Sequence, residues 1–194
     1  YSLPGRISVR TLVGLFSFLF ISILNPTTAQ VLTNENAAIS ITGGTVLKGD
    51  TIDNAAGEIQ NDGTIELNGH YLNSGLTRGD GNFDIRGNWD NSGTFQPGLS
   101  TVQLYGLATQ MISNSGTGSF YNLVINNSGT FPSSSIILNH SIEVSGSLSM
   151  NQGIIEAGIN TLYLSNQSAS SLSYTSGRIL GKFERGISAT DNYL

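Results

Sequence analysis

The feature that most constrains the fold is a short turn sequence that recurs at a fixed distance along the chain. The five residues Asn91 to Phe95 (NSGTF) return unchanged at Asn127 to Phe131, 36 positions later. Asn-Ser-Gly or Ala-Ala-Gly also occurs at steps of 18, so we interpret 36 as two turns of an 18-residue unit. Fixed-period self-similarity indicates a repeat architecture in which each unit stacks on the last. The corner residues predicted on this basis are Gly57, Asn73, Gly75, Asn91, Gly93, Asn127, Gly129 and Gly146.

The 18-residue register is interrupted once. One further step of this length from Gly93 reaches Met111, and the nearest Asn-Ser-Gly triplet, 114–116, is displaced by five positions. The unit at 63–75 aligns best with the unit at 81–93, because their glycines and their Asn-Ser-Gly triplets coincide.

Between the turns, apolar residues alternate with polar ones. Alternation over four to six residues is typical of a half-buried strand, and Asn and Gly between the runs are turn residues because both tolerate positive φ. No stretch after residue 30 has a 3.6-residue period. The alternating pairs are Ile65 and Leu67, Phe83 and Ile85, Val102 and Leu104, Leu123 and Ile125, Ile142 and Val144, Leu148 and Met150, and Leu162 and Leu164.

We therefore predict an all-β fold, a right-handed parallel β-helix (solenoid) with 18-residue coils. Sandwiches and barrels also use short strands, but they do not require one turn sequence to recur at a constant step. In a β-helix the coils stack at the strand spacing of about 4.8 Å, which places equivalent residues on top of one another. Glycine would then supply the bend at a corner, and stacked asparagines would hydrogen-bond along the axis.

The N-terminal segment has the composition of a secretory signal peptide. Arg6 and Arg10 precede an apolar run at 11–24, and small residues follow, so we predict a signal peptide at 1–29 and a secreted or cell-surface location. The apolar run is too short to cross a bilayer core of about 30 Å. We expect an N-terminal cap or first coil at 30–48, the β-helix at 49–187, and the start of a truncated following segment at 188–194.

Charge and cysteine usage narrow the possible partners. The chain has eight basic and thirteen acidic residues, and removing residues 1–29 with their two arginines lowers the net charge from −5 to −7. An acidic chain without a basic cluster argues against nucleic acid and anionic membranes as partners. The absence of cysteine excludes disulfides and cysteine-based zinc sites. We expect no cofactor and no membrane insertion after signal removal.

The coil sequences resemble those of a known group of proteins. Residues 142–155, 160–164 and 181–185, with the earlier segments 87–95 and 120–123, are similar to coils of large, repetitive secreted proteins of Bacteroidota. The resemblance covers about residues 50–187. It implies export as type IX secretion cargo and an adhesin-like role at the cell surface, where glycans or other surface proteins would be the partners.

One group of outward-facing residues could carry chemistry. The alternation places Glu66 beside Asp84 on adjacent strands, with His70 nearby. Paired carboxylates suit general acid–base catalysis because a like charge nearby raises one pKa. The alternative is a solvated polar face with an incidental acidic pair, and we favour it because paired carboxylates mark sites only statistically.

Three further patterns are weaker. Tyr71 and Trp89 could form a platform for sugar rings, but their parity with the apolar residues indicates a core position. Asp80 and Asp84 lie in a glycine- and aspartate-containing segment that resembles a calcium coil, although the pattern does not repeat. Asp50-Thr51-Ile52 resembles a short O-glycosylation motif of Bacteroidota, which would modify Thr51.

The sequence thus predicts a structural or adhesive β-helical stalk without catalytic activity. The alternative is a carbohydrate-binding or carbohydrate-cleaving β-helix of the pectin-lyase kind, using Glu66, Asp84 and His70. A passive spacer that presents another domain is compatible with the same observations.

Overall fold

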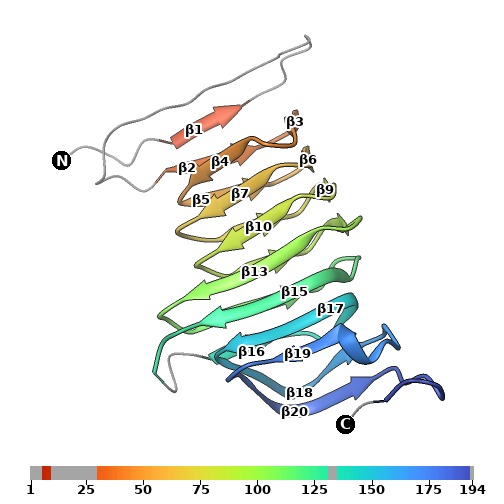
Figure 1. The fold of residues 1–194 in the computed structure, drawn as a ribbon. Coiled ribbons are helices and arrows are strands. Elements are labelled where there is room, and N and C mark those ends of the chain that lie inside the picture. Colours follow the sequence, from red (N-terminus) through yellow and green to blue (C-terminus); the bar gives the residue numbers. More distant parts are fainter. Residues whose placement is uncertain (1–5, 10–29, 131–134, 193–194) are drawn as a thin grey trace.

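Parallel strands stack along one axis in the computed structural model, which describes residues 6–9, 30–130 and 135–192 (Figure 1). The strands form a β-solenoid of about eight turns, with no α-helix among the described residues, so the predicted parallel β-helix is confirmed. The apolar run at 11–24 of the predicted signal peptide lies outside the described residues. None of the described residues belongs to a helix able to span a membrane.

The strands are short near the N-terminus and longer near the C-terminus. The elements in chain order are β1 (Arg6–Val9), β2 (Val31–Asn34), β3 (Ala38–Ile41), β4 (Val46–Gly49), β5 (Thr51–Asn54), β6 (Glu58–Asn61), β7 (Thr64–Leu67), β8 (Tyr71–Asn73), β9 (Leu76–Arg78), β10 (Asn82–Ile85), β11 (Trp89–Asn91), β12 (Thr94–Gln96), β13 (Thr101–Gly106), β14 (Gln110–Asn114), β15 (Phe120–Asn127), β16 (Ser135–Leu138), β17 (Ile142–Gln152), β18 (Ile154–Leu164), the 3₁₀ turn η1 (Ala169–Ser171), β19 (Leu172–Tyr174) and β20 (Arg178–Arg185).

Each coil contributes strands to three faces. Face A contains β2, β5, β8, β11, β14 and β16 and continues into the first residues of β18 and β20. Face B is the separate four-stranded sheet β3, β6, β9 and β12. Face C contains β4, β7, β10, β13, β15 and β19, with the second part of β17. The 11-residue strands β17 and β18 bend around a corner and pair with each other through 142–144 and 162–164, which joins faces A and C into one sheet.

The first coil begins at residue 31. The segment 30–48, expected to be a cap or a first coil, holds β2, β3 and most of β4, one strand on each face, and all three pair with the next coil. The backbone of β1 pairs in parallel with β2 at the N-terminal edge.

The core is a column of alternating side chains from all three faces. All seven predicted apolar pairs are buried, as the period of two requires. Tyr71 and Trp89 are in register on adjacent strands and stack with ring centroids 4.8 Å apart, while Phe83 meets each ring edge-on. Their burial confirms a core role and excludes the sugar platform at these two residues. The Trp89 indole N–H has no hydrogen-bond partner among the described residues.

The predicted 18-residue coil length holds only in part of the solenoid. On face A, Trp89 pairs with Tyr71, 18 positions earlier, but with Ile112, 23 positions later. The next step, from Ile112 to Leu138, spans 26 positions. The inward positions stay in register because the additional residues are placed mainly at the corners.

Asparagine side chains stack inside the corner between faces A and B. Asn54 donates to Asn73, and Asn73 donates to Asn91, each across 2.7 Å. The predicted asparagine column is therefore confirmed, and it is longer than expected, since Asn34 lies before it and Asn114 after it. Each amide from Asn34 to Asn91 also donates to a carbonyl at the start of the following B-face segment, as Asn73 does to Thr94. These bonds satisfy amides that are buried in the interior.

The second copy of NSGTF does not occupy this corner. The prediction that the two copies lie at the same corner, two 18-residue coils apart, is therefore wrong. Asn127 ends β15, pairs with Gly106, and donates to Gln110 across 3.0 Å at the corner between faces C and A. Gly129 follows in that same segment. Asn114 is the residue that pairs with Asn91, 23 positions later. The extra residues of that coil shift the second copy to a different corner.

The predicted corner glycines fall into two groups. Gly57, Gly75 and Gly93, joined by Gly116, form one column, in which a Cβ on Gly93 would lie 2.2 Å from the Gly75 carbonyl oxygen. Gly146 lies instead at the bend of β17 between faces B and C. A Cβ on Gly146 would lie 2.6 Å from the Tyr121 carbonyl oxygen. Glycine is required in the column because the backbone of the neighbouring coil occupies the space of a side chain.

Candidate functional site

The predicted carboxylate pair lies on the outer surface of face C. β7 and β10 place Glu66 and Asp84 directly opposite each other, as expected from the alternation. Lys48 is next to Glu66 on β4, and its Nζ lies 2.6 Å from Glu66 Oε2. Gln103 flanks Asp84 on the other side. The row is thus lysine, glutamate, aspartate and glutamine, with Glu66 engaged in an ion pair.

Asp84 has a perturbed affinity for protons. Partial burial, followed by the negative charge of Glu66, raises the pKa of Asp84 above its ordinary value. The Glu66 hydrogen bond and charge in turn raise the pKa of the exposed Lys48. A carboxyl with a raised pKa can act as a proton donor, so this pair is the feature that favours an acid–base function.

His70 takes part in a backbone-capping row at the corner between faces C and A. Its Nδ1 accepts the backbone N–H of Asn88 across 2.9 Å, and the backbone N–H of His70 donates to Thr51 Oγ1 across 3.1 Å. Asn88 Oδ1 accepts the Met111 N–H in the next coil. The Nδ1 atom is therefore occupied in a bond between coils. His70 lies beyond the end of β7, so the three predicted catalytic residues do not converge in one recess.

The calcium candidates are separated in the same way. Asp80 lies at the corner between faces B and C, where its Oδ1 accepts the Leu99 N–H across 2.8 Å. Asp84 lies farther along, within β10 on face C. The described residues contain no group of three or more His, Cys, Asp or Glu side chains placed to hold a metal ion.

Thr51, the proposed glycosylation residue, is the first residue of β5 and is partly buried. Its Oγ1 accepts the His70 N–H, and it would be 2.6 Å from a Cβ on Gly69. A sugar on this oxygen would have to be accommodated at a close-packed corner.

Two shallow grooves flank face B, and neither was predicted. The larger, of about 550 Å³, follows the glycine column at the corner between faces A and B, along Gly57, Gly75 and Gly93. The smaller, of about 290 Å³, lies at the opposite edge of the face and is called here the face B hollow. It is lined by Gln60, Asp62, Arg78, Gly79, Asp80, Gln96 and Gly98.

The 18-residue period places polar side chains of the hollow in rows. Gln60, Arg78 and Gln96 are in register on β6, β9 and β12. Asp62 and Asp80 stack at the corner beside them, where the Asp80 N–H donates to Asp62 Oδ1. The same 18-residue step that located the corners would have found both rows. The sequence interpretation missed them because it followed turn motifs and carboxylate pairs.

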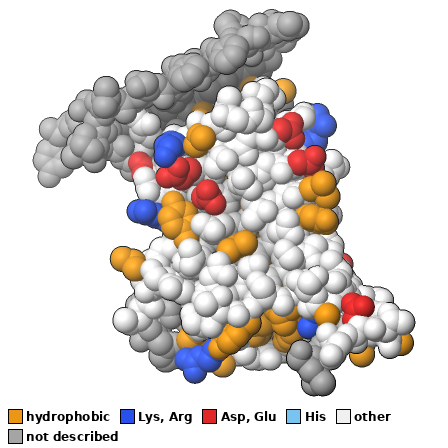
Figure 2. Space-filling view, viewed as in Figure 1, with side chains coloured by type: hydrophobic (Ala, Val, Ile, Leu, Met, Phe, Trp, Pro, Cys, Tyr) orange, Lys and Arg blue, Asp and Glu red, His pale blue; other side chains and the backbone are white. Residues whose placement is uncertain are grey.

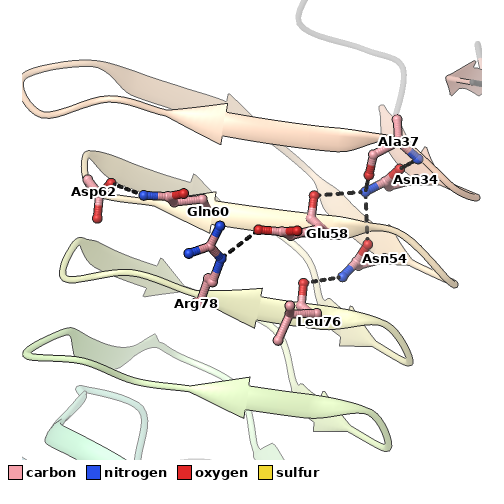
Figure 3. Close-up of polar contacts among 8 residues, drawn as sticks. All are labelled: Asn34, Ala37, Asn54, Glu58, Gln60, Asp62, Leu76 and Arg78. Carbon is pink, nitrogen blue, oxygen red and sulfur yellow. Dashed lines mark hydrogen bonds and ion pairs between the residues drawn. The ribbon is translucent and has the colours of Figure 1, made fainter. Parts of the chain in front are cut away.

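Hydrogen bonds fix several of these side chains (Figure 3). Arg78 Nε lies 2.5 Å from Glu58 Oε1, and Gln60 Nε2 donates to Asp62 Oδ2 across 2.8 Å. The terminal nitrogens of Arg78 point toward Gln60 and away from Glu58 (Figure 3). At the opposite edge of face B, the amides of Asn34 and Asn54 donate to the carbonyls of Glu58 and Leu76, where β6 and β9 begin (Figure 3).

Charged side chains are unevenly distributed over the surface. Figure 2 shows acidic and basic groups over the upper coils and over the lowest coil, with a largely uncharged surface between them. This pattern follows the sequence, since residues 91–142 contain no Asp, Glu, Lys or Arg. Charge-based recognition is therefore confined to the two ends of the solenoid.

Comparison with protein-family models, with curated proteins and with solved structures gives no match to this chain.

Proposed function

We propose that this protein is a secreted or surface-exposed structural β-helix with an adhesive role and without catalytic activity. The observation that carries the proposal is that the candidate catalytic side chains bond to residues of neighbouring coils. Glu66 pairs with Lys48, and His70 caps a backbone amide of the next coil. Such bonds stabilise coil stacking, which suits an extended support. Solenoids also offer long polar faces for weak, repeated contacts.

Export is the second part of the proposal, supported by the order of basic, apolar and small residues at 1–29. The resemblance to surface proteins of Bacteroidota supports a final location outside the cell. Expression of the chain with a C-terminal epitope in a host of that phylum tests this. Loss of the epitope from intact cells on protease treatment supports surface exposure, and an epitope that stays in the cytoplasm with residues 1–29 uncleaved contradicts export.

The competing function is that of a carbohydrate-binding or carbohydrate-cleaving β-helix of the pectin-lyase kind, favoured by the adjacency of Asp84 and Glu66 and by the raised pKa of Asp84. Release of reducing ends from polygalacturonate and from neutral glucans, measured between pH 4 and 9, distinguishes the two. We expect no release above that of a heat-denatured sample. Release that disappears in Glu66→Gln and Asp84→Asn, but persists in Gln103→Ala, would establish the competing function.

Adhesion itself is measurable with beads that carry the chain. We expect beads coated with the folded protein to bind to glycan-coated surfaces more strongly than beads coated with the denatured protein. Equal binding by the two would remove the adhesive part of the proposal and leave a support.

A further inference from the structure

We propose that the face B hollow is a binding site for neutral saccharides. The inference deepens the adhesive role proposed above and rests on it. The hollow combines a recess with a row of hydrogen-bonding side chains, of which Gln60 and Arg78 are held by hydrogen bonds.

Two glycines in the lining let the chain lie close against the neighbouring coil. Gly79 and Gly98 have φ of +124° and +51°, which other residues rarely adopt. A Cβ on Gly98 would lie 2.1 Å from Asp80 Oδ1, and a Cβ on Gly79 would lie 2.1 Å from the Asn61 oxygen. The volume of about 290 Å³ lies just below the lower limit for ligand pockets, about 300 Å³, so the shallow hollow would hold only part of a short saccharide.

The row of polar side chains supplies both donors and acceptors. Gln60, Arg78 and Gln96 repeat at the strand spacing of about 4.8 Å. Arg78 has five N–H donors and uses its Nε for Glu58, while its terminal nitrogens point to the Gln60 side. Hydroxyl groups donate and accept, so a polyhydroxylated ring can satisfy amide, guanidinium and carboxylate groups together.

The charge of the hollow selects against anionic ligands. The hollow is lined by Arg78 together with Asp62 and Asp80, and Arg78 forms an ion pair with Glu58. Three carboxylates therefore accompany one guanidinium. The net potential is therefore negative, and a uronic acid or a phosphate would be repelled. Face C provides the internal comparison, since its row of Glu66, Asp84 and Gln103 is equally polar and lines neither of the two grooves.

The test is titration of the ¹⁵N-labelled 194-residue chain with neutral gluco-, manno- and galacto-oligosaccharides, observed through the backbone amides of Gly79, Gly98 and Leu99. No aromatic ring lines the hollow, so we expect dissociation constants on the order of 1 mM. The double variant Arg78→Ala/Gln96→Ala should weaken binding about tenfold or more, which corresponds to about 1.4 kcal/mol.

A matched control changes the same two residue types on face C. Arg86→Ala/Gln103→Ala should leave the affinity unchanged, and circular dichroism verifies that both double variants are folded. Shifts of these amides that are lost only in the face B variant support the inference. Equal loss or equal retention in both variants, stronger binding of oligogalacturonate, or binding that requires calcium ions would overturn it.

The outcome separates this inference from the adhesive proposal. Saccharide binding that persists in the face B variant rejects the hollow and leaves adhesion through another face. A folded wild-type chain that binds no saccharide in the panel rejects the hollow as well. In that case bead adhesion to protein-coated surfaces still decides whether the solenoid is adhesive.

Discussion

The coils formed by residues 51–96 and those formed by residues 101–185 build the same three-faced core with different corners. In the first region, inward residues recur after 18 or 19 positions, and glycines from successive coils touch at the corners. In the second region, the steps between paired residues lie between 19 and 26. Inward residues pair with inward residues in both regions, although bulges interrupt the β15–β17 and β18–β20 pairings. The extra length of the later coils therefore lies at the corners and in these bulges.

The difference has a steric origin. A short corner keeps the backbones of neighbouring coils in contact, and a side chain does not fit between them, as at Gly75 and Gly93. A long corner moves outward into solvent. A methyl group on Gly158 would have no atom of another residue within 4 Å, apart from its chain neighbours, and the adjacent Ile159 is fully exposed. Insertions are therefore tolerated where the chain can leave the stack.

The largest expected effect is at a short corner. Gly93→Ala places a methyl group 2.2 Å from the Gly75 oxygen, and should lower the free energy of unfolding by about 3 kcal/mol. The change is measured by urea unfolding followed by circular dichroism. Gly158→Ala is the matched variant at a long corner, where only the positive φ opposes alanine, and should cost about 1 kcal/mol. Equal losses in the two variants would contradict the steric distinction between corners.

A smaller effect is expected in the buried asparagine column. Asn73→Ala leaves the donor of Asn54 and the acceptor of Asn91 without their partner, and should cost about 2 kcal/mol. Asn166→Ala in the second region removes a bond to the Gly146 oxygen and the acceptor of the Ser168 N–H, both at a partly exposed position, and should cost about 0.5 kcal/mol. The same urea titrations measure both. A cost for Asn166→Ala as large as that for Asn73→Ala would show that burial is not what makes the column important.

The smallest effect concerns Asp84 and depends on pH. Because folding raises the pKa of Asp84, the folded state binds this proton more tightly, and stability falls as pH rises from the ordinary aspartate range through the raised value. Asp84→Asn should therefore have a slightly higher melting temperature than the wild type at pH 7, with the difference diminishing toward pH 3. Thermal unfolding between pH 3 and pH 8 measures it.

Asp90→Asn is the control for this prediction, because Asp90 pairs with Leu72 and Ser113 and has no acidic residue beside it in the ladder. It should not reproduce the difference that burial and the charge of Glu66 cause at Asp84. A lower melting temperature for Asp84→Asn at pH 7 would mean that the ionised carboxylate stabilises the fold.

The core was predictable from local sequence, and the site was predictable only in part. Alternation identified the inward residues of seven strand segments, because a strand turns each side chain to the opposite face from the last. Adjacency of Glu66 and Asp84 followed from the same rule combined with the 18-residue step. The 18-residue step could not place residues beyond the first long corner, because the alternation within strands does not determine how many residues a corner contains.

The sequence by itself determined that the chain is a stack of parallel strands with an apolar interior and a polar exterior. Only the tertiary structure decided which corners are equivalent. The two copies of NSGTF illustrate this, because Asn91 and Asn127 begin identical segments and lie at different corners. It also decided that His70 caps a backbone amide and that Gly79 and Gly98 line a recess beside Arg78. The physical reason is that alternation is a local property of each strand, whereas contacts between coils depend on the summed length of every strand and corner between them.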